Sequence, residues 1–87
     1  MRLLGRNHLQ KIRGRSAQTD RWLAAWVSEV INAKWKASID VVKQYRAVTR
    51  VAEGTFLFPI EDFDGFVELQ IAFPQGVALI TAVQNRL

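Results

Sequence analysis

The stretch LAAWVSEVINAKWKASIDVVKQYRAVT, residues 23–49, decides most of the fold. Apolar residues recur in its first part at the three- and four-residue spacing of one helix face. With the residue before the stretch, they are Trp22, Leu23, Trp26, Val27, Val30 and Ile31. We expect this helix to begin with Thr19 as its N-cap and to end near residues 32–34, with its tryptophans serving as core anchors. Trp35 marks a break. Ser38 is then expected to cap a short helix that reaches Gln44 or Tyr45, with Ile39 and Val42 inward and Tyr45 as a further candidate for this face.

Outside this stretch the apolar residues alternate, which is typical of strands. We expect strands at residues 47–52, 55–60, 66–73 and 77–83, the last covered on both faces, and a short strand at residues 1–4. Residues 7–13 predict a short helix with Leu9 and Ile12 inward. Turns are expected at residues 64–65 and 74–76. Pro59 cannot donate to a β-ladder, which places its strand at an edge or a bulge.

Helices followed by a meander of strands predict an α+β fold. We expect one domain, residues 1–87, in which N-terminal helices pack on one face of a small antiparallel β-sheet. The chain has no cysteine, which excludes a disulfide framework and a thiolate metal site. It shows no phosphate loop, nucleophile motif or zinc-ligand spacing, so we predict no cofactor and no metal. Apolar runs are short and no signal peptide is evident, so we expect a cytoplasmic protein without a membrane segment.

Charge is distributed unevenly along the chain. Residues 1–50 contain eleven Lys or Arg and three Asp or Glu, a net charge of +8, whereas residues 51–87 carry a net charge of −4. The helical half is therefore expected to present a basic surface, which suits nucleic acid or an acidic partner. The alternative is a solvated face of an ordinary small basic protein.

An ordered set of residues in the opening stretch resembles the HigB-type toxin family, which is RelE-like. The set is Trp26 in a helix, then AKWK at residues 33–36, IDVVK at residues 39–43, and Tyr45 followed by Arg46. TFLFPI, residues 55–60, is similar to the family's VVFNI strand. Gly76 falls where the family turns between its last two strands. The resemblance implies a RelE-like fold and a type II toxin–antitoxin module, with a cognate antitoxin, expected to be a helix-turn-helix protein, as partner. It also implies metal-free mRNA cleavage, often on the ribosome.

This sequence departs from the family at its catalytic positions. The family's Tyr-Arg pair aligns with Gly65 and Phe66, its final-strand arginine with Thr81, and its tail histidine lies near Arg86. The family's asparagine before the turn is Pro59 here. These departures leave two functions open. One is an mRNA-cleaving toxin with a rearranged site, and the other is a catalytically inactive protein that binds an antitoxin, RNA or another protein through its basic helical face.

RNA cleavage without a metal needs a proton acceptor, a proton donor and cations for the charge that develops on the phosphate. We assign the catalytic cations to Arg46, Arg50 and Arg86. The predicted nucleic-acid-binding residues are Lys34, Lys36, Lys43 and Tyr45. Arg13 and Arg15 extend this basic surface.

Two further groups carry weaker predictions. His8 is the single histidine and is a candidate base, although a packing role is favoured. Glu61, Asp62 and Asp64 predict a charged hairpin tip rather than a cation site. Such a tip is also suited to docking on a basic partner.

Overall fold

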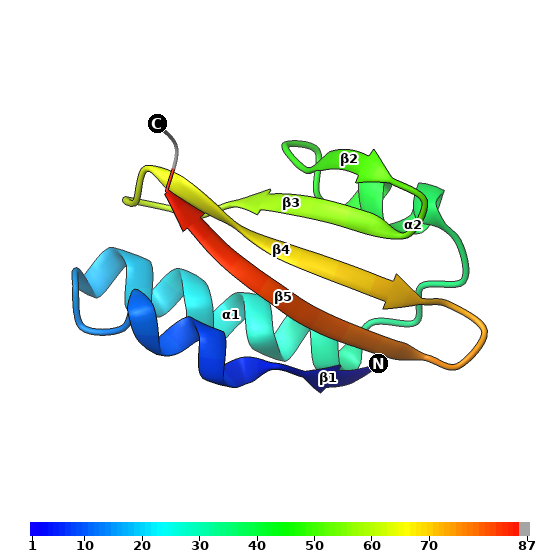
Figure 1. The fold of residues 1–87 in the computed structure, drawn as a ribbon, viewed down its shortest axis with the longest axis horizontal. Helices are drawn as coiled ribbons and strands as arrows, with labels where there is room; N and C mark the ends of the chain where they lie inside the picture. The colour runs from blue at the N-terminus through cyan, green and yellow to red at the C-terminus, as the bar shows by residue number, and fades with distance from the viewer. Residues whose placement is uncertain (86–87) are drawn as a thin grey trace.

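The computed structural model describes residues 1–85 of the chain. A short strand β1 and a 3₁₀ helix η1 come first, two α-helices follow, and four strands complete the fold (Figure 1). The elements are β1 (Arg2–Leu4), η1 (Arg6–Lys11), α1 (Ala17–Asn32), α2 (Ser38–Gln44), β2 (Thr49–Ala52), β3 (Thr55–Pro59), β4 (Gly65–Ala72) and β5 (Val77–Asn85). The expected α+β class is confirmed. None of the helices in residues 1–85 is long and apolar enough to cross a membrane.

The sheet is mixed, so the prediction of an antiparallel sheet is only partly right. Its five strands are ordered β1-β5-β4-β3-β2, and β2 to β5 form an antiparallel meander. β1 adds to the free edge of β5 in parallel, with Leu3 opposite Ala78. β1 and β5 are parallel because of the path of the chain between them. After β1 the chain passes through the helices to β2 at the far edge of the sheet. It then returns strand by strand, so that β5 runs in the same direction as β1.

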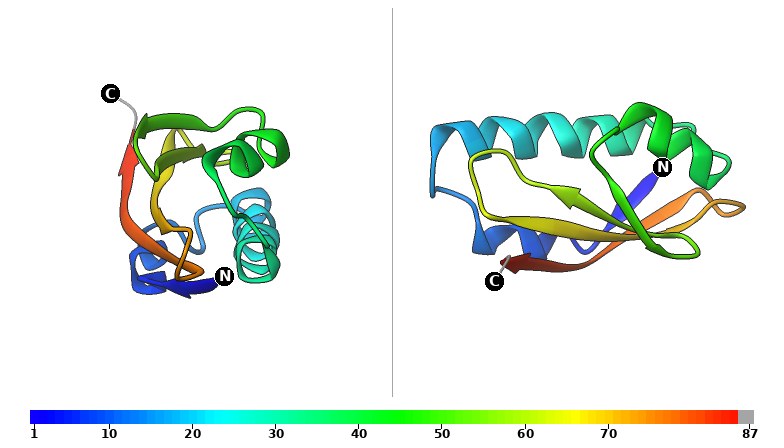
Figure 2. Two further views of the ribbon diagram at one scale, coloured as in Figure 1. Left: turned by 90° about the vertical axis from the view of Figure 1, so that its right-hand side faces the viewer. Right: turned by 90° about the horizontal axis from the view of Figure 1, so that it is seen from above.

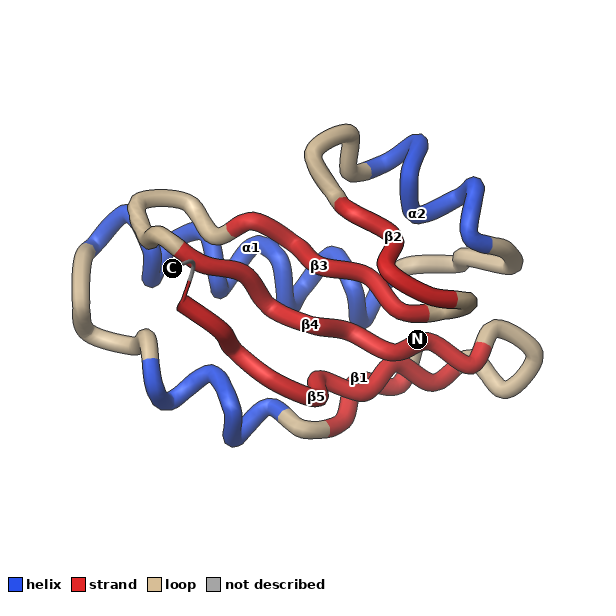
Figure 3. The backbone as a smooth tube through the Cα atoms, turned by 45° about the horizontal axis from the view of Figure 1, so that its top comes forward, coloured by secondary structure: helices blue, strands red, loops and turns tan. Residues whose placement is uncertain are grey.

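Helices α1 and α2 lie on the same side of the curved sheet, and η1 lies beside β5 (Figures 2 and 3). The core fills the space between the helices and one sheet face. Alternate strand residues face this space, including Phe56, Phe58, Val67, Leu69 and Ile80, all at most 1% exposed. Leu9 and Ile12 are fully buried as predicted, so η1 closes the β5 side of the core.

The second face of the sheet is open, because no helix in residues 1–85 lies over it (Figure 2). The prediction that the last strand is covered on both faces is therefore wrong. Leu79 is 39% exposed, whereas its neighbours Ala78 and Ile80 are buried. A register shift in β5 between the partners of Glu68 and Leu69 restores the inward position of Val83 further along the strand.

Helix α1 begins earlier than predicted. Ser16 is the N-cap, and its hydroxyl oxygen accepts a hydrogen bond from the Thr19 backbone N–H at 3.0 Å. Thr19 lies inside the first turn and is fully buried. Its hydroxyl donates to the carbonyl oxygen of Glu61 at 2.8 Å, so this threonine attaches α1 to the β3–β4 hairpin instead of capping the helix.

Helix α2 also differs from the prediction at its start. Its N-cap is Ala37 rather than Ser38. Asp40 supplies the cap from within the first turn, because one carboxylate oxygen accepts from the backbone N–H groups of Lys36 and Ala37 at 2.8 and 3.2 Å.

The buried face of α2 is also different. Val41 is fully buried, whereas Ile39 and Val42 are 56% and 37% exposed. In a helix of seven residues a single row faces the core, and here it is the Val41 and Tyr45 row.

The β4–β5 turn has the predicted conformation, whereas the β3–β4 turn has its positive φ at a different residue from the one predicted. Gly76 has a positive φ of 67° and donates to the carbonyl of Phe73, as the predicted turn requires. In the β3–β4 hairpin the positive φ belongs to Asp62, not to Gly65. Gly65 is needed for space, because a Cβ there would lie 2.1 Å from the carbonyl oxygen of Gln84. Pro59 lies beyond the start of β2, where its missing N–H faces no strand of the sheet.

Candidate functional site

The cations of the helical half lie on the surface. All eleven Lys and Arg residues of residues 1–50 are exposed. Between residues 1 and 85 a single ion pair forms, and it joins Arg50 to Glu53 across the β2–β3 turn. The remaining cations of this half are therefore not neutralised by a carboxylate of the described chain. Such a surface attracts phosphate through long-range charge, and it is screened by salt.

Lys34 and Lys36 follow α1 on either side of Trp35. The indole of Trp35 is buried, and its Nε1–H donates to Oε1 of Gln44 at 2.9 Å. Because this tryptophan is held inside, both lysines are turned outward. They line a surface hollow of about 400 Å³, the amino-terminal hollow, together with Met1 and the β4–β5 turn. The amino group of Met1 donates to the carbonyl of Ile31 at 2.7 Å, so β1 and the end of α1 form one wall.

Tyr45 and Arg46 share a second hollow of about 220 Å³, the Tyr45 hollow. It is lined by Trp22, Gln44, Tyr45, Arg46, Ala47, Val48, Phe58 and Pro59. Aromatic packing sets its shape: the Tyr45 ring meets Phe58 edge-on with centroids 5.1 Å apart, and Trp22 stacks on Trp26 at 5.8 Å. Among the lining residues that the structure describes, Arg46 is the only cation. This hollow offers flat apolar walls and one positive charge.

The Tyr45 hydroxyl is engaged on the helical side. It hydrogen-bonds with the carboxylate of Glu29 on α1. Burial of the phenol, followed by this hydrogen bond and the charge of Glu29, raises the pKa of Tyr45 well above its ordinary value of 10.0. A phenol in this state stays protonated at neutral pH and is a weaker acid than a free phenol, so Tyr45 is unsuited to take up a proton.

Of the arginines predicted as catalytic, the structure describes Arg46 and Arg50, and these two do not line a common hollow. Arg46 lines the Tyr45 hollow, whereas Arg50 lies on edge strand β2 and pairs with Glu53. Arg86 lies outside the described residues. Of the predicted binding residues, Lys34 and Lys36 come together at the amino-terminal hollow, Tyr45 joins Arg46, and Lys43 is exposed on α2 and lines none of the three hollows described.

The weaker candidates, His8 and the acidic hairpin, lie outside the amino-terminal and Tyr45 hollows. His8 is half-buried on η1 and lines none of these hollows. The acidic hairpin contacts α1: Glu61 accepts from the side-chain amide of Gln18 at 3.0 Å, and the carbonyl of Asp62 accepts from Thr19. Within residues 1–85 no three His, Asp or Glu side chains form a metal-binding group.

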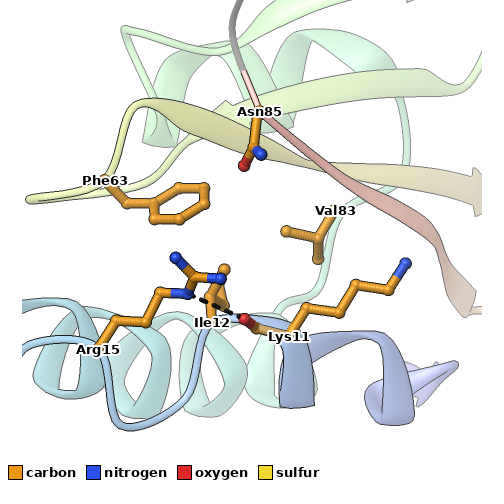
Figure 4. Close-up of a pocket in the computed structure, with 6 residues that line it drawn as sticks. All are labelled: Lys11, Ile12, Arg15, Phe63, Val83 and Asn85. Atoms are coloured by element: carbon orange, nitrogen blue, oxygen red, sulfur yellow. Dashed lines mark hydrogen bonds between the residues drawn. The ribbon is translucent and has the colours of Figure 1, made fainter.

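The sequence analysis did not predict a third hollow, which we call the Arg15 hollow. It measures about 430 Å³ and is lined by Lys11, Ile12, Arg15, Phe63, Val83 and Asn85. Its cations come from the end of η1 and the loop before α1, Phe63 from the β3–β4 hairpin, and Asn85 from the end of β5 (Figure 4). Arg15 stood in the predicted basic loop, but nothing in sequence spacing places residues 63 and 85 beside it.

Comparison of the chain with models of known protein families gives no match, and comparison with curated proteins gives none.

Proposed function

We propose that this protein is a HigB-type toxin homologue of a type II toxin–antitoxin module, cytoplasmic, acting on mRNA at the ribosome and paired with a helix-turn-helix antitoxin. The support for the family is the ordered set of Trp26, Trp35, Lys36, Tyr45 and Arg46 in the sequence. In the fold, these residues belong to the two helices and the segments that follow them, and the meander comes next. A RelE-like arrangement is part of the same proposal.

One observation carries the RNA part of this proposal. The cations of residues 1–50 are all exposed, and apart from Arg50 they make no ion pair within the described chain. An RNA strand that binds there gains phosphate contacts and releases counterions without first breaking protein salt bridges. Lys34, Lys36, Lys43 and Arg46 are exposed, and we assign RNA binding to these four cations.

A second function, binding without cleavage, is favoured by the surroundings of Tyr45. Among residues 1–85, the lining of the Tyr45 hollow has one cation and no carboxylate or histidine, and the hydroxyl of Tyr45 hydrogen-bonds with Glu29. Cleavage at this hollow would lack a proton acceptor for the ribose hydroxyl. Under this alternative, the toxin fold serves to bind RNA, an antitoxin or another protein.

The deciding experiment is cleavage of mRNA in a reconstituted translation reaction. Wild type is compared with an Arg46→Ala/Arg50→Ala variant. An Arg2→Ala/Arg6→Ala variant is the matched control, because it removes the same charge near β1, at the opposite edge of the sheet from β2. Cleavage that is lost in the first variant and retained in the control supports a toxin whose site includes Arg46 and Arg50.

The other results are equally informative. If folded wild type cleaves no mRNA but retains RNA in a filter-binding assay, the binding function replaces the cleaving one. If it neither cleaves nor binds RNA, the proposed RNA target is wrong. Growth arrest on induced expression, relieved by the gene product of an adjacent helix-turn-helix gene, tests the antitoxin partner separately.

A further inference from the structure

The guanidinium of Arg15 is positioned before any ligand arrives. Its Nε–H donates to the carbonyl oxygen of Lys11 at 3.1 Å, and its central carbon lies 5.7 Å from the centre of the Phe63 ring (Figure 4). These two contacts restrict the side chain from both sides. Its terminal nitrogens have no acceptor within residues 1–85. An anchored arginine with free terminal N–H groups is suited to paired hydrogen bonds with a phosphate.

The walls around Arg15 divide into a polar and an apolar part. Ile12 is buried and forms the floor, while Phe63 and Val83 are partly exposed and form apolar sides. Asn85 points from the end of β5 into the space and offers both an amide donor and a carbonyl acceptor (Figure 4). Lys11 adds a second cation at the rim. The hollow is complementary to a ligand with an anionic head and a flat body that carries hydrogen-bonding edges.

No carboxylate side chain of residues 1–85 lines this hollow. Asp20 accepts from the backbone N–H of Gly14, and Glu61 accepts from Gln18, so both carboxylates are engaged with groups of the α1 end. Asp62 and Asp64 flank Phe63 on the hairpin but are not among the lining residues. Among residues 1–85, the charges that line the space are the two cations Lys11 and Arg15, which favours an anion over a cation there.

We infer that the Arg15 hollow binds a nucleoside monophosphate, either free or as the phosphorylated end of an RNA strand. The phosphate contacts Arg15 and Lys11, and the base lies against Phe63 and meets the amide of Asn85. A volume of about 430 Å³ suits one nucleotide, since small-molecule sites span about 300–1,000 Å³. This site goes beyond the proposed function, because it shares no residue with the Tyr45 hollow or the amino-terminal hollow.

The first test titrates the full chain with AMP, adenosine and inorganic phosphate by calorimetry. AMP is expected to bind at least about tenfold more tightly than either part, because only AMP uses both the cations and the apolar walls. Arg15→Gln should weaken AMP binding by about tenfold or more. Arg13→Gln is the matched control: it removes the same charge from the same loop, but Arg13 does not line the hollow.

Phe63→Leu separates the base contact from the phosphate contact. It retains an apolar side chain and removes the ring, so it should reduce the preference for AMP over phosphate while leaving Arg15-dependent phosphate binding. Thermal unfolding of each variant establishes that the hollow is still formed. Equal losses in Arg15→Gln and Arg13→Gln, or phosphate binding as tight as AMP binding, would overturn the inference.

The source of the nucleotide is decided with two short RNA strands of one sequence, one with a terminal 5′-phosphate and one with a 5′-hydroxyl. Arg15-dependent preference for the phosphorylated strand identifies an RNA end as the ligand. Binding of AMP with no difference between the strands identifies a free nucleotide. If neither ligand depends on Arg15, the site does not exist. None of these results uses mRNA cleavage, so the toxin proposal succeeds or fails independently.

Discussion

Tyr45 shows at the scale of one residue how packing changes chemistry. It is the only tyrosine of the chain, and both burial and the Glu29 carboxylate raise its pKa. A raised pKa means that folding stabilises the neutral phenol. This contribution to stability is complete below the ordinary pKa of 10.0 and is lost as pH rises past it toward the pKa of the folded state.

A direct titration checks this. We expect the near-ultraviolet absorbance of tyrosinate to appear at higher pH in the native protein than in the urea-unfolded protein. Glu29→Gln should move the native transition part of the way back, since burial remains as the larger cause. Coincident transitions in native and unfolded wild type would contradict the burial of the phenol and its contact with Glu29.

Gly5 and Gly14 form a matched pair of glycines. Both have a φ of 81°, but a Cβ at Gly5 would lie 2.4 Å from the backbone oxygen of Ile80, whereas nothing lies within 4 Å of one at Gly14. Gly14→Ala should therefore cost only the strain of the left-handed backbone, about 1–2 kcal/mol. Gly5→Ala should lower the free energy of unfolding by more than this, because η1 must move away from β5.

Urea unfolding of the two alanine variants measures the difference. Equal losses would show that η1 does not lie against β5 as closely as the structure has it. The comparison is informative because the two sites differ in contact and not in backbone conformation.

At the scale of elements, the N-terminus of α2 is capped by Asp40 and not by Ser38, the residue that the sequence suggests. Ser38 has the residue type of an N-cap, but Asp40 accepts from both preceding N–H groups. We expect Asp40→Ala to lower the free energy of unfolding by about 1 kcal/mol. Ser38→Ala should stay within about 0.5 kcal/mol of wild type, because Ser38 is not the N-cap of α2. Urea unfolding is the measurement, and a larger loss for Ser38→Ala would show that serine is the cap after all.

The arrangement of the elements also explains why Arg46 and Arg50, both predicted as catalytic, lie in different surroundings. Arg46 and Arg50 are four residues apart in sequence, but one follows α2 at a hollow and the other enters an edge strand. Between them the chain changes from helix to extended backbone, so side chains that a continuous helix would bring together point to different surroundings.

At the scale of the whole molecule, the division of charge predicts how RNA binds. If Lys34, Lys36, Lys43 and Arg46 form the RNA surface, the logarithm of the binding constant should fall linearly with the logarithm of salt concentration, by about 0.7 for each phosphate neutralised on a single strand. Lys34→Ala/Lys36→Ala should reduce this slope and weaken binding to all sequences alike. Filter binding over a range of salt concentrations measures both effects.

A salt-independent affinity would contradict the electrostatic basis of the proposed RNA surface. An unchanged slope in the double lysine variant would instead place the phosphate contacts elsewhere on the molecule. Arg2→Ala/Arg6→Ala provides the comparison for charge removed from the β1 edge.

The sequence by itself determined the elements and their order. Periodicity identified α1 because Trp26 and Val30 recur on one face, and alternation identified β4 because Val67, Leu69 and Ile71 share a face. Leu9 and Ile12 were correctly placed in the core. These features follow from local rules, since an amphipathic segment has few ways to bury its apolar side.

Only the tertiary structure decided which distant residues are in contact. Parallel pairing of β1 with β5, the open second face that leaves Leu79 exposed, and the meeting of Arg15 with Phe63 and Asn85 all join residues far apart in the chain. Sequence spacing carries no information about such contacts, because they depend on how the chain returns to the sheet. The basic surface was visible from composition, but its division into separate hollows was set by the packing of Trp35, Tyr45 and Phe63.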